Sequence, residues 1–323
     1  NSLSSNSSPN STQLSFHQFS NDQILEQQNL FQQRQQSYLS RHPSSLPARW
    51  PISSAKSPSS SHIEHFQRTL RSFCSPALAS GLLSSDSTRR IAALTFLKEN
   101  YAQVLDCHID LVLHCLAIQL FLTPLQPTIT ELALSTLTLI IDQMKNAPDD
   151  VTMSDYDAAC FLPYFMCQLG PLHGYSEQFE HIIGSTCSLY ATSKVFRCLL
   201  MVSKVPKVVE ETRVECLRLM GQMIHRYSLN VCSLSDTIPT FASFVTNKAT
   251  KPQLAAALKG FVFIYGHFAA TQQTVPWSKM LSRCKLSNGQ IRTINKFIKS
   301  STHFESSNNS DTSTTLSNNS DTS

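Results

Sequence analysis

The sequence predicts an all-α fold, a stack of antiparallel helix pairs. Three observations indicate this: few glycines, apolar residues that recur every three or four positions, and turn signals at regular intervals. Eight glycines among 323 residues are about a third of average usage. That is too few for a turn-rich β-sandwich or a glycine-rich phosphate loop, and no stretch alternates long enough to predict a strand.

The two ends of the chain differ in composition from its middle. In residues 1–60, 31 of 60 residues are Ser, Gln or Asn, and residues 306–323 are almost wholly Ser, Asn, Thr and Asp. Such segments bury too little apolar surface to offset chain entropy. We therefore expect a disordered linker over 1–60, one folded unit over 61–305, and a disordered tail over 306–323.

Helical periodicity runs through the middle of the chain, for example over 89–101, 129–144 and 214–227. The longest apolar stretch, 106–122, is too short and too polar for a bilayer span and predicts a buried core helix. Second helices of successive pairs are expected to begin near residues 86, 126, 175, 208 and 251. Their mean spacing of about 41 residues is typical of HEAT or armadillo repeats. The alternative is an irregular α-helical domain.

Ten cysteines are present. They include no CxxC pair and mostly lie in apolar helical runs, which predicts reduced core thiols in a cytosolic protein.

The formal net charge of +4 is too small for a nucleic-acid module, and no nucleic acid or membrane is expected as a partner. The position of the charges is more informative. In a stack of pairs, the turns from first to second helix emerge along one edge. Seven basic residues lie in or beside these turns: Arg89, Arg90, Lys204, Lys207, Arg213, Lys248 and Lys251. Only three acids accompany them: Asp86, Glu210 and Glu211. This pattern predicts docking to an acidic protein surface; the alternative is that surface loops simply collect lysine.

Catalytic and metal-binding patterns are missing from the sequence. GxSxG, HExxH, GxxxxGK[ST] and GxGxxG do not occur. His62 and His65 have no third ligand spaced to join them, and Cys107, His108, His114 and Cys115, in one apolar helix, lack the fixed short spacings of zinc ligands. Residues 161–165 predict a Pro-kinked core helix. We expect no enzyme, no cofactor and no metal.

The segment from Glu211 to Cys232, with RVECL near its start and NVC at its end, resembles the last TOG domain of the microtubule polymerases. Three shorter segments, 110–121, 161–164 and 193–196, are similar to that domain in the same order. A closing helix over 286–300 also fits, so the resemblance spans about 62–304.

The resemblance implies a solenoid of six HEAT repeats whose intra-repeat loops bind αβ-tubulin or microtubules without catalysis. It also implies a role in plus-end growth and spindle or centrosome organisation, a location at the cytoskeleton and spindle poles, and a TACC-type adaptor as a partner of other regions of the full protein. Arg213 matches the family's fourth-loop Arg; its alternatives are pairing with Glu215 or capping a neighbouring helix. The first loop lacks the family's Trp, and Leu254 stands near the fifth-loop Arg. These departures suit weaker or lattice-side contacts. Two alternatives are an adaptor for another acidic protein and a structural subunit of an enzyme.

Overall fold

The computed structural model describes residues 58–71, 74–100, 109–122, 126–147, 152–271 and 276–308. The predicted disordered ends, 1–60 and 306–323, lie almost wholly outside these residues. The helices are α2 (Ser60–Leu70), α3 (Pro76–Leu82), α4 (Ser87–Glu99), α6 (Ile109–Leu122), α7 (Pro127–Asn146), α8 (Asp155–Cys167), η2 (His173–Tyr175), α9 (Ser176–Leu189), α10 (Thr192–Ser203), α11 (Glu210–Tyr227), η3 (Leu229–Val231), α12 (Leu234–Ser243), α13 (Lys251–Ala270), α14 (Trp277–Arg283) and α15 (Asn288–Asn308).

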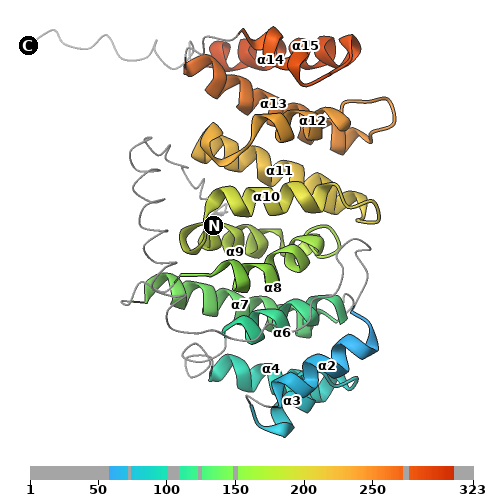
Figure 1. The fold of residues 1–323 in the computed structure, drawn as a ribbon, viewed down its shortest axis with the longest axis vertical. Helices are drawn as coiled ribbons and strands as arrows, with labels where there is room; N and C mark the ends of the chain where they lie inside the picture. The colour runs from blue at the N-terminus through green and yellow to red at the C-terminus, as the bar shows by residue number, and fades with distance from the viewer. Residues whose placement is uncertain are drawn as a thin grey trace, which may run out of the picture.

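These helices form an elongated stack of six antiparallel pairs, which run α3–α4, α6–α7, α8–α9, α10–α11, α12–α13 and α14–α15 (Figure 1). In one layer α7 packs between α4 and α9, and α13 packs between α11 and α15. In the other layer α8 packs between α6 and α10. The predicted all-α solenoid is confirmed, and the five predicted second helices begin within two residues of the expected positions.

The core is continuous along the stack because each pair buries its apolar side against its neighbours. Helix α6 is buried on nearly all sides from Ile109 to Phe121, as its composition predicts. Helix α8 contains Pro163 and buries Phe161, Tyr164 and Phe165 to 1% exposure or less, so this segment is a Pro-containing core helix. Within the described residues, no helix has the length and apolarity needed to cross a bilayer.

The cysteines of the described residues are free thiols. Burial raises the pKa of Cys115, Cys167 and Cys187 to about 12, which keeps these thiols protonated at neutral pH.

The turn that follows α8 approaches the α11 backbone closely at Gly170. Its N–H donates to Thr212 Oγ1 at 3.2 Å, and the same hydroxyl donates to the Cys167 carbonyl at 3.1 Å. A Cβ at position 170 would lie only 2.7 Å from the carbonyl carbon of Glu211 and closer still to the Thr212 nitrogen. Glycine is therefore required here because a backbone, which cannot rotate away, occupies the space.

Gly170→Ala is expected to destabilise the fold by about 2 kcal/mol, the usual cost of overpacking. Thermal unfolding followed by circular dichroism measures the effect. Gly266→Ala in α13 is the control, because a Cβ there meets nothing within 4 Å; it should be neutral or stabilise by up to about 1 kcal/mol. Equal melting points for the two variants would contradict the close contact.

A buried histidine pair joins α2 to the stack. His62 Nε2 lies 3.3 Å from His114 Nε2, and His114 Nδ1 lies 2.9 Å from the Cys160 carbonyl. A carbonyl only accepts, so His114 Nδ1 carries the proton and its Nε2 accepts from His62. Burial lowers the pKa of His62, and the nearby His65 lowers it further.

This pair makes stability depend on pH. The pKa of His62 is lower in the folded than in the unfolded chain, so the unfolded chain binds the proton first as the pH falls below about 6.5. Stability is therefore full above that pH and declines below it. Between pH 7.5 and 5.5, His62→Gln should reduce the loss of melting temperature by roughly 2–4 °C relative to the parent chain. His65→Gln, at an exposed position of the same helix, should retain most of the parent's pH dependence.

Candidate functional site

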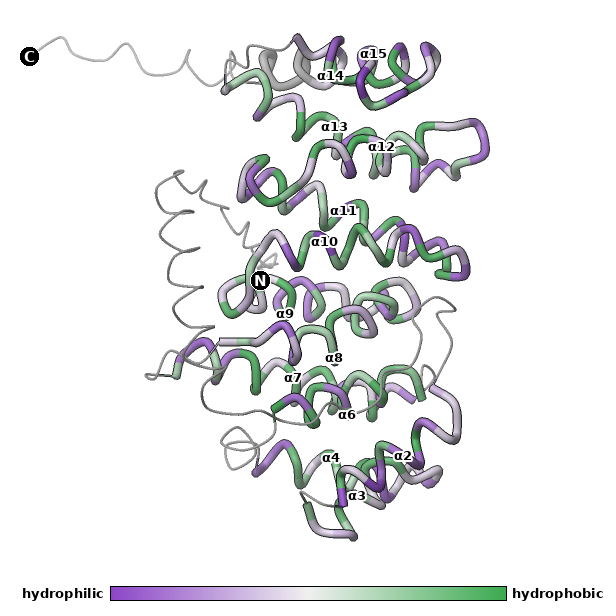
Figure 2. Tube along the Cα trace, in the orientation of Figure 1, coloured by the Kyte–Doolittle hydropathy of each residue, from purple (hydrophilic) through white to green (hydrophobic). Residues whose placement is uncertain are grey.

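The turns from first to second helices lie along one side of the stack, the right side in Figure 1. We call this side the loop edge and define it by residues 83–86, 168–175, 204–209, 244–250 and 284–287, together with the first turn of each helix that follows. Hydrophilic residues mark the turn between α12 and α13 at this edge (Figure 2). Alternating helix direction places the turns together, as the sequence predicts.

In the first turn, the structure separates the two predicted arginines. Asp86 caps α4 by accepting from the Thr88 N–H at 2.9 Å. The side chain of Arg89 is 74% exposed and lies 3.9 Å from Asp86. Arg90 is only 5% exposed, and burial lowers its guanidinium pKa. Because Arg90 belongs to the buried face of α4 with Ala93, it does not contribute to the exposed edge.

In the fourth turn, Lys204 and Lys207 are exposed, whereas Arg213 is half-buried and engaged. Its Nη2 donates to the Val205 carbonyl at 3.0 Å and to the Pro206 carbonyl at 2.6 Å. Arg213 therefore fixes the turn that carries the two lysines. Glu215, its alternative partner, pairs with Arg218 at 2.7 Å instead.

In the fifth turn, Lys248 and Lys251 are both exposed. Thr250 and Gln253 form a capping box at the start of α13, with hydrogen bonds of 3.4 and 3.3 Å. Lys251 is the first residue of that helix. A cation there is opposed by the helix dipole, so its position favours an external anion rather than helix stability.

Leu254, near the expected fifth-loop arginine, is half-buried against the core. Because Leu254 carries no charge, Lys248 and Lys251 are the charged groups of the fifth turn.

Sequence reasoning did not single out three exposed apolar side chains. Met201 and Val209 flank the fourth turn at 45% and 46% exposure, and Phe96 in α4 is 54% exposed. Phe96 and Arg89 both line a groove of about 540 Å³ between α3 and α4. The signal was available for Met201, which falls outside the buried stripe of α10 made by Val195, Leu199 and Val202.

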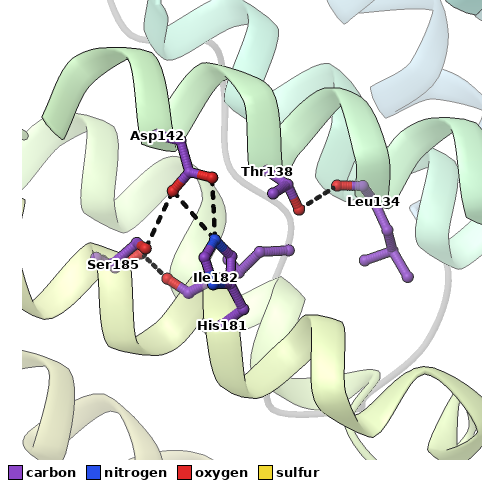
Figure 3. Close-up of polar contacts among 7 residues, drawn as sticks. Leu134, Thr138, Asp142, His181, Ile182 and Ser185 are labelled. Carbon is purple, nitrogen blue, oxygen red and sulfur yellow. Dashed lines mark hydrogen bonds and ion pairs between the residues drawn. The ribbon is translucent and has the colours of Figure 1, made fainter. Parts of the chain in front are cut away.

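One cluster brings together the residue types of a hydrolase triad. Figure 3 shows Asp142 of α7 with His181 and Ser185 of α9. His181 Nε2 lies 3.0 Å from the carboxylate, and Ser185 Oγ donates to the same carboxylate at 3.1 Å. A nucleophilic serine must donate to histidine, whereas here it donates to aspartate. This cluster joins two helices and lacks the geometry for nucleophilic catalysis.

Over the part of the chain that the structure describes, no group of three or more His, Cys, Asp or Glu residues is placed to hold a metal ion. His62 hydrogen-bonds to His114, as described above, while His65 is exposed. Cys107 and His108 lie outside the described residues.

Comparison with known proteins supports the fold. No family model matches the sequence. A structure from work on how TOG–tubulin binding specificity promotes microtubule dynamics and mitotic spindle formation is 18% identical, with a TM-score of 0.66 over 85% of this chain and 97% of that chain. A TOG domain from C. elegans Zyg9 is 19% identical, with a TM-score of 0.65 over 84% and 94%. The chain has the TOG-domain fold, and the predicted resemblance is confirmed at the level of the fold.

Arg213→Ala is expected to loosen the fourth turn. Loss of two charge-assisted hydrogen bonds at a half-exposed site should lower local stability by about 1 kcal/mol, because no guanidinium would then hold the Val205 and Pro206 carbonyls in the turn 204–209. Amide hydrogen exchange should then be roughly fivefold faster at Val205 and Val208. Arg218→Ala is the control: its guanidinium bonds Glu180 and Glu215, so exchange in the turn should not change. Unchanged exchange in Arg213→Ala would contradict the role assigned here.

Proposed function

We propose that this chain is a tubulin-binding module and that its loop edge makes the contact. Exposed cations on three turns of one edge of a TOG fold carry the proposal: Arg89, Lys204, Lys207, Lys248 and Lys251. Arg213 acts by holding the fourth turn, and Arg90 is left out because it is buried. Binding involves no covalent chemistry and no cofactor.

The chemistry of the edge suits an acidic protein surface that is partly apolar. Lysine ammonium groups and the Arg89 guanidinium pair with carboxylates, and Met201 and Val209 supply apolar area beside Lys204 and Lys207. One of the two comparison structures comes from work on TOG–tubulin binding. We further propose that the chain acts in microtubule plus-end growth and spindle or centrosome organisation, at the cytoskeleton in the cytoplasm.

The loop edge also lacks two features expected of a surface that binds tubulin with high affinity. Its first turn, Leu83 to Asp86, carries no aromatic residue, and the fifth turn offers lysines rather than a guanidinium fork. Contacts of this kind are weak singly and depend on ionic strength. They fit lattice-side binding, where several domains or several lattice sites act together.

Two double charge reversals test this function: Lys204→Glu with Lys207→Glu, and Lys248→Glu with Lys251→Glu. Each should weaken co-sedimentation with microtubules at low salt by about tenfold or more, because carboxylates would then face carboxylates. The control is Lys145→Glu with Arg197→Glu, two exposed residues away from the loop edge that change the net charge equally. The control should retain binding within about twofold.

The outcome also separates tubulin from other partners. Gel filtration with unpolymerised tubulin reports binding to the free dimer, and co-sedimentation reports binding to the lattice. No shift in either assay for the parent chain at low salt would contradict the proposal. An equal loss in the control pair would mean that total charge, rather than the loop edge, drives binding. Unchanged microtubule binding in both edge variants, with loss of a different acidic protein, would favour the adaptor alternative.

A further inference from the structure

Charge is segregated along the chain far more strongly than its total suggests. Residues 61–236 contain 13 Lys or Arg and 17 Asp or Glu, a net charge of −4. Residues 237–304 contain nine Lys or Arg and no acidic residue, a net charge of +9. The second segment comprises most of α12, all of α13 and α14, and residues 288–304 of α15, at the C-terminal end of the stack in Figure 1. The acids of these helices are confined to Asp236 near the start of α12 and Glu305 near the end of α15, so cations predominate at this end.

All nine cations are exposed. Lys248 and Lys251 belong to the loop edge already described. We call the other seven the basic end: Lys259, Lys279, Arg283, Lys285, Arg292, Lys296 and Lys299. They lie on three successive helices and on the short connection between α14 and α15.

Capping of the solenoid does not account for this composition. A terminal repeat needs a polar outer face, and residues of both signs satisfy that need. Here cations recur four residues apart on the same helix: Lys279 and Arg283 on α14, and Arg292 and Lys296 on α15. Like charges at this spacing destabilise a helix. The arrangement therefore favours an anionic partner over solubility alone.

The chemistry of the basic end narrows the class of partner. Single-stranded nucleic acid is held by aromatic platforms, but Trp277 packs edge-on against Tyr265 and Phe268 and donates to Asn295 at 3.1 Å. Membrane binding needs apolar side chains that insert. The exposed large apolar residues of the described chain are Phe96, Met201 and Val209, all outside the basic end.

The type of cation also bears on the partner. Five of the seven residues are lysines, which are compact point charges on flexible stems and lack the rigid planar fork with which a guanidinium binds one oxyanion bidentately. Mobile ammonium groups spread over three helices suit a flexible chain of carboxylates.

We propose that the basic end is a second binding surface, which takes an extended, carboxylate-rich segment of a protein partner. It adjoins the loop edge at α13, because Lys251 and Lys259 lie on that one helix. An acidic segment that continues from a partner docked on the loop edge could follow it without a break. The surface does not depend on that partner being tubulin.

The test uses the full chain and a fluorescein-labelled peptide of twelve glutamates, with binding followed by fluorescence anisotropy. The parent chain should bind, and its affinity should fall about tenfold between 50 and 200 mM NaCl. The variant with Arg283→Gln, Lys285→Gln, Arg292→Gln and Lys296→Gln should lose about tenfold in affinity at 50 mM NaCl.

The control variant carries Arg68→Gln, Arg71→Gln, Lys98→Gln and Lys145→Gln, the same number of Arg and Lys replaced elsewhere on the stack. It should lose less than about twofold. Circular dichroism verifies that each variant is folded, and the milder Lys285→Gln with Lys296→Gln, expected to lose about threefold, tests the proposal even if the fourfold variant unfolds.

Equal binding by the fourfold variant and its control would overturn the proposal. So would binding to a 24-base-pair DNA duplex, or to vesicles containing an anionic lipid, more than tenfold tighter than to the peptide at 150 mM NaCl, because the partner would then be of another class. The peptide assay contains no tubulin. Failure of the proposed tubulin binding would therefore leave this result unaffected, and the reverse also holds.

Discussion

The structure depends on one constraint: a single pair of helices cannot bury its own apolar face. Cys216, Leu217 and Met220 of α11 are fully buried because α10 and α13 pack on this helix from the two layers. The same holds along the stack, so every pair is stabilised by its neighbours. Stacking in one orientation also forces all first-to-second turns to one edge. The apolar pattern that provides stability therefore also assembles the candidate binding edge from turns far apart in the sequence.

The turns are held by the protein's own polar groups rather than left for a partner to order. Thr212 bonds the backbone at both Gly170 and Cys167, and the next residue, Arg213, bonds the carbonyls of Val205 and Pro206. Two adjacent residues at the start of α11 thus fix two neighbouring turns. Binding to such an edge costs little loop-ordering entropy, so even modest charge pairs contribute to affinity.

The helix starts were predictable from the sequence because they depend on local signals, such as Pro127 at the start of α7 and the Thr250 cap of α13. The direction in which each side chain points was harder to predict from the sequence. Adjacent Arg89 and Arg90 differ because α4 turns only the latter toward the core, a rotation set by packing on α3 and α7. Spacing with Ala93, Leu94 and Leu97 did carry that information. The role of Arg213 did not follow from sequence, because its acceptors are main-chain carbonyls that only the folded turn brings within reach.

Because charge is segregated along the chain, the two ends of the stack differ in charge although both are built from similar helix pairs. The Debye length is about 8 Å at physiological ionic strength, less than the roughly 10 Å between packed helices, so an approaching acidic surface responds mainly to the nearest pairs. Around α3–α4, Arg89 lies beside Asp86, and the local field is nearly balanced. Residues 237–304, from α12 into α15, carry nine cations and no acid. In the proposed binding mode, encounter with an acidic surface is therefore steered toward the C-terminal pairs, and the fifth turn, rather than the first, makes the initial contact. The C-terminal end of the loop edge then supplies the larger part of the electrostatic attraction in this binding mode. The groove beside Phe96 and Arg89, at the other end, contributes shape and apolar area.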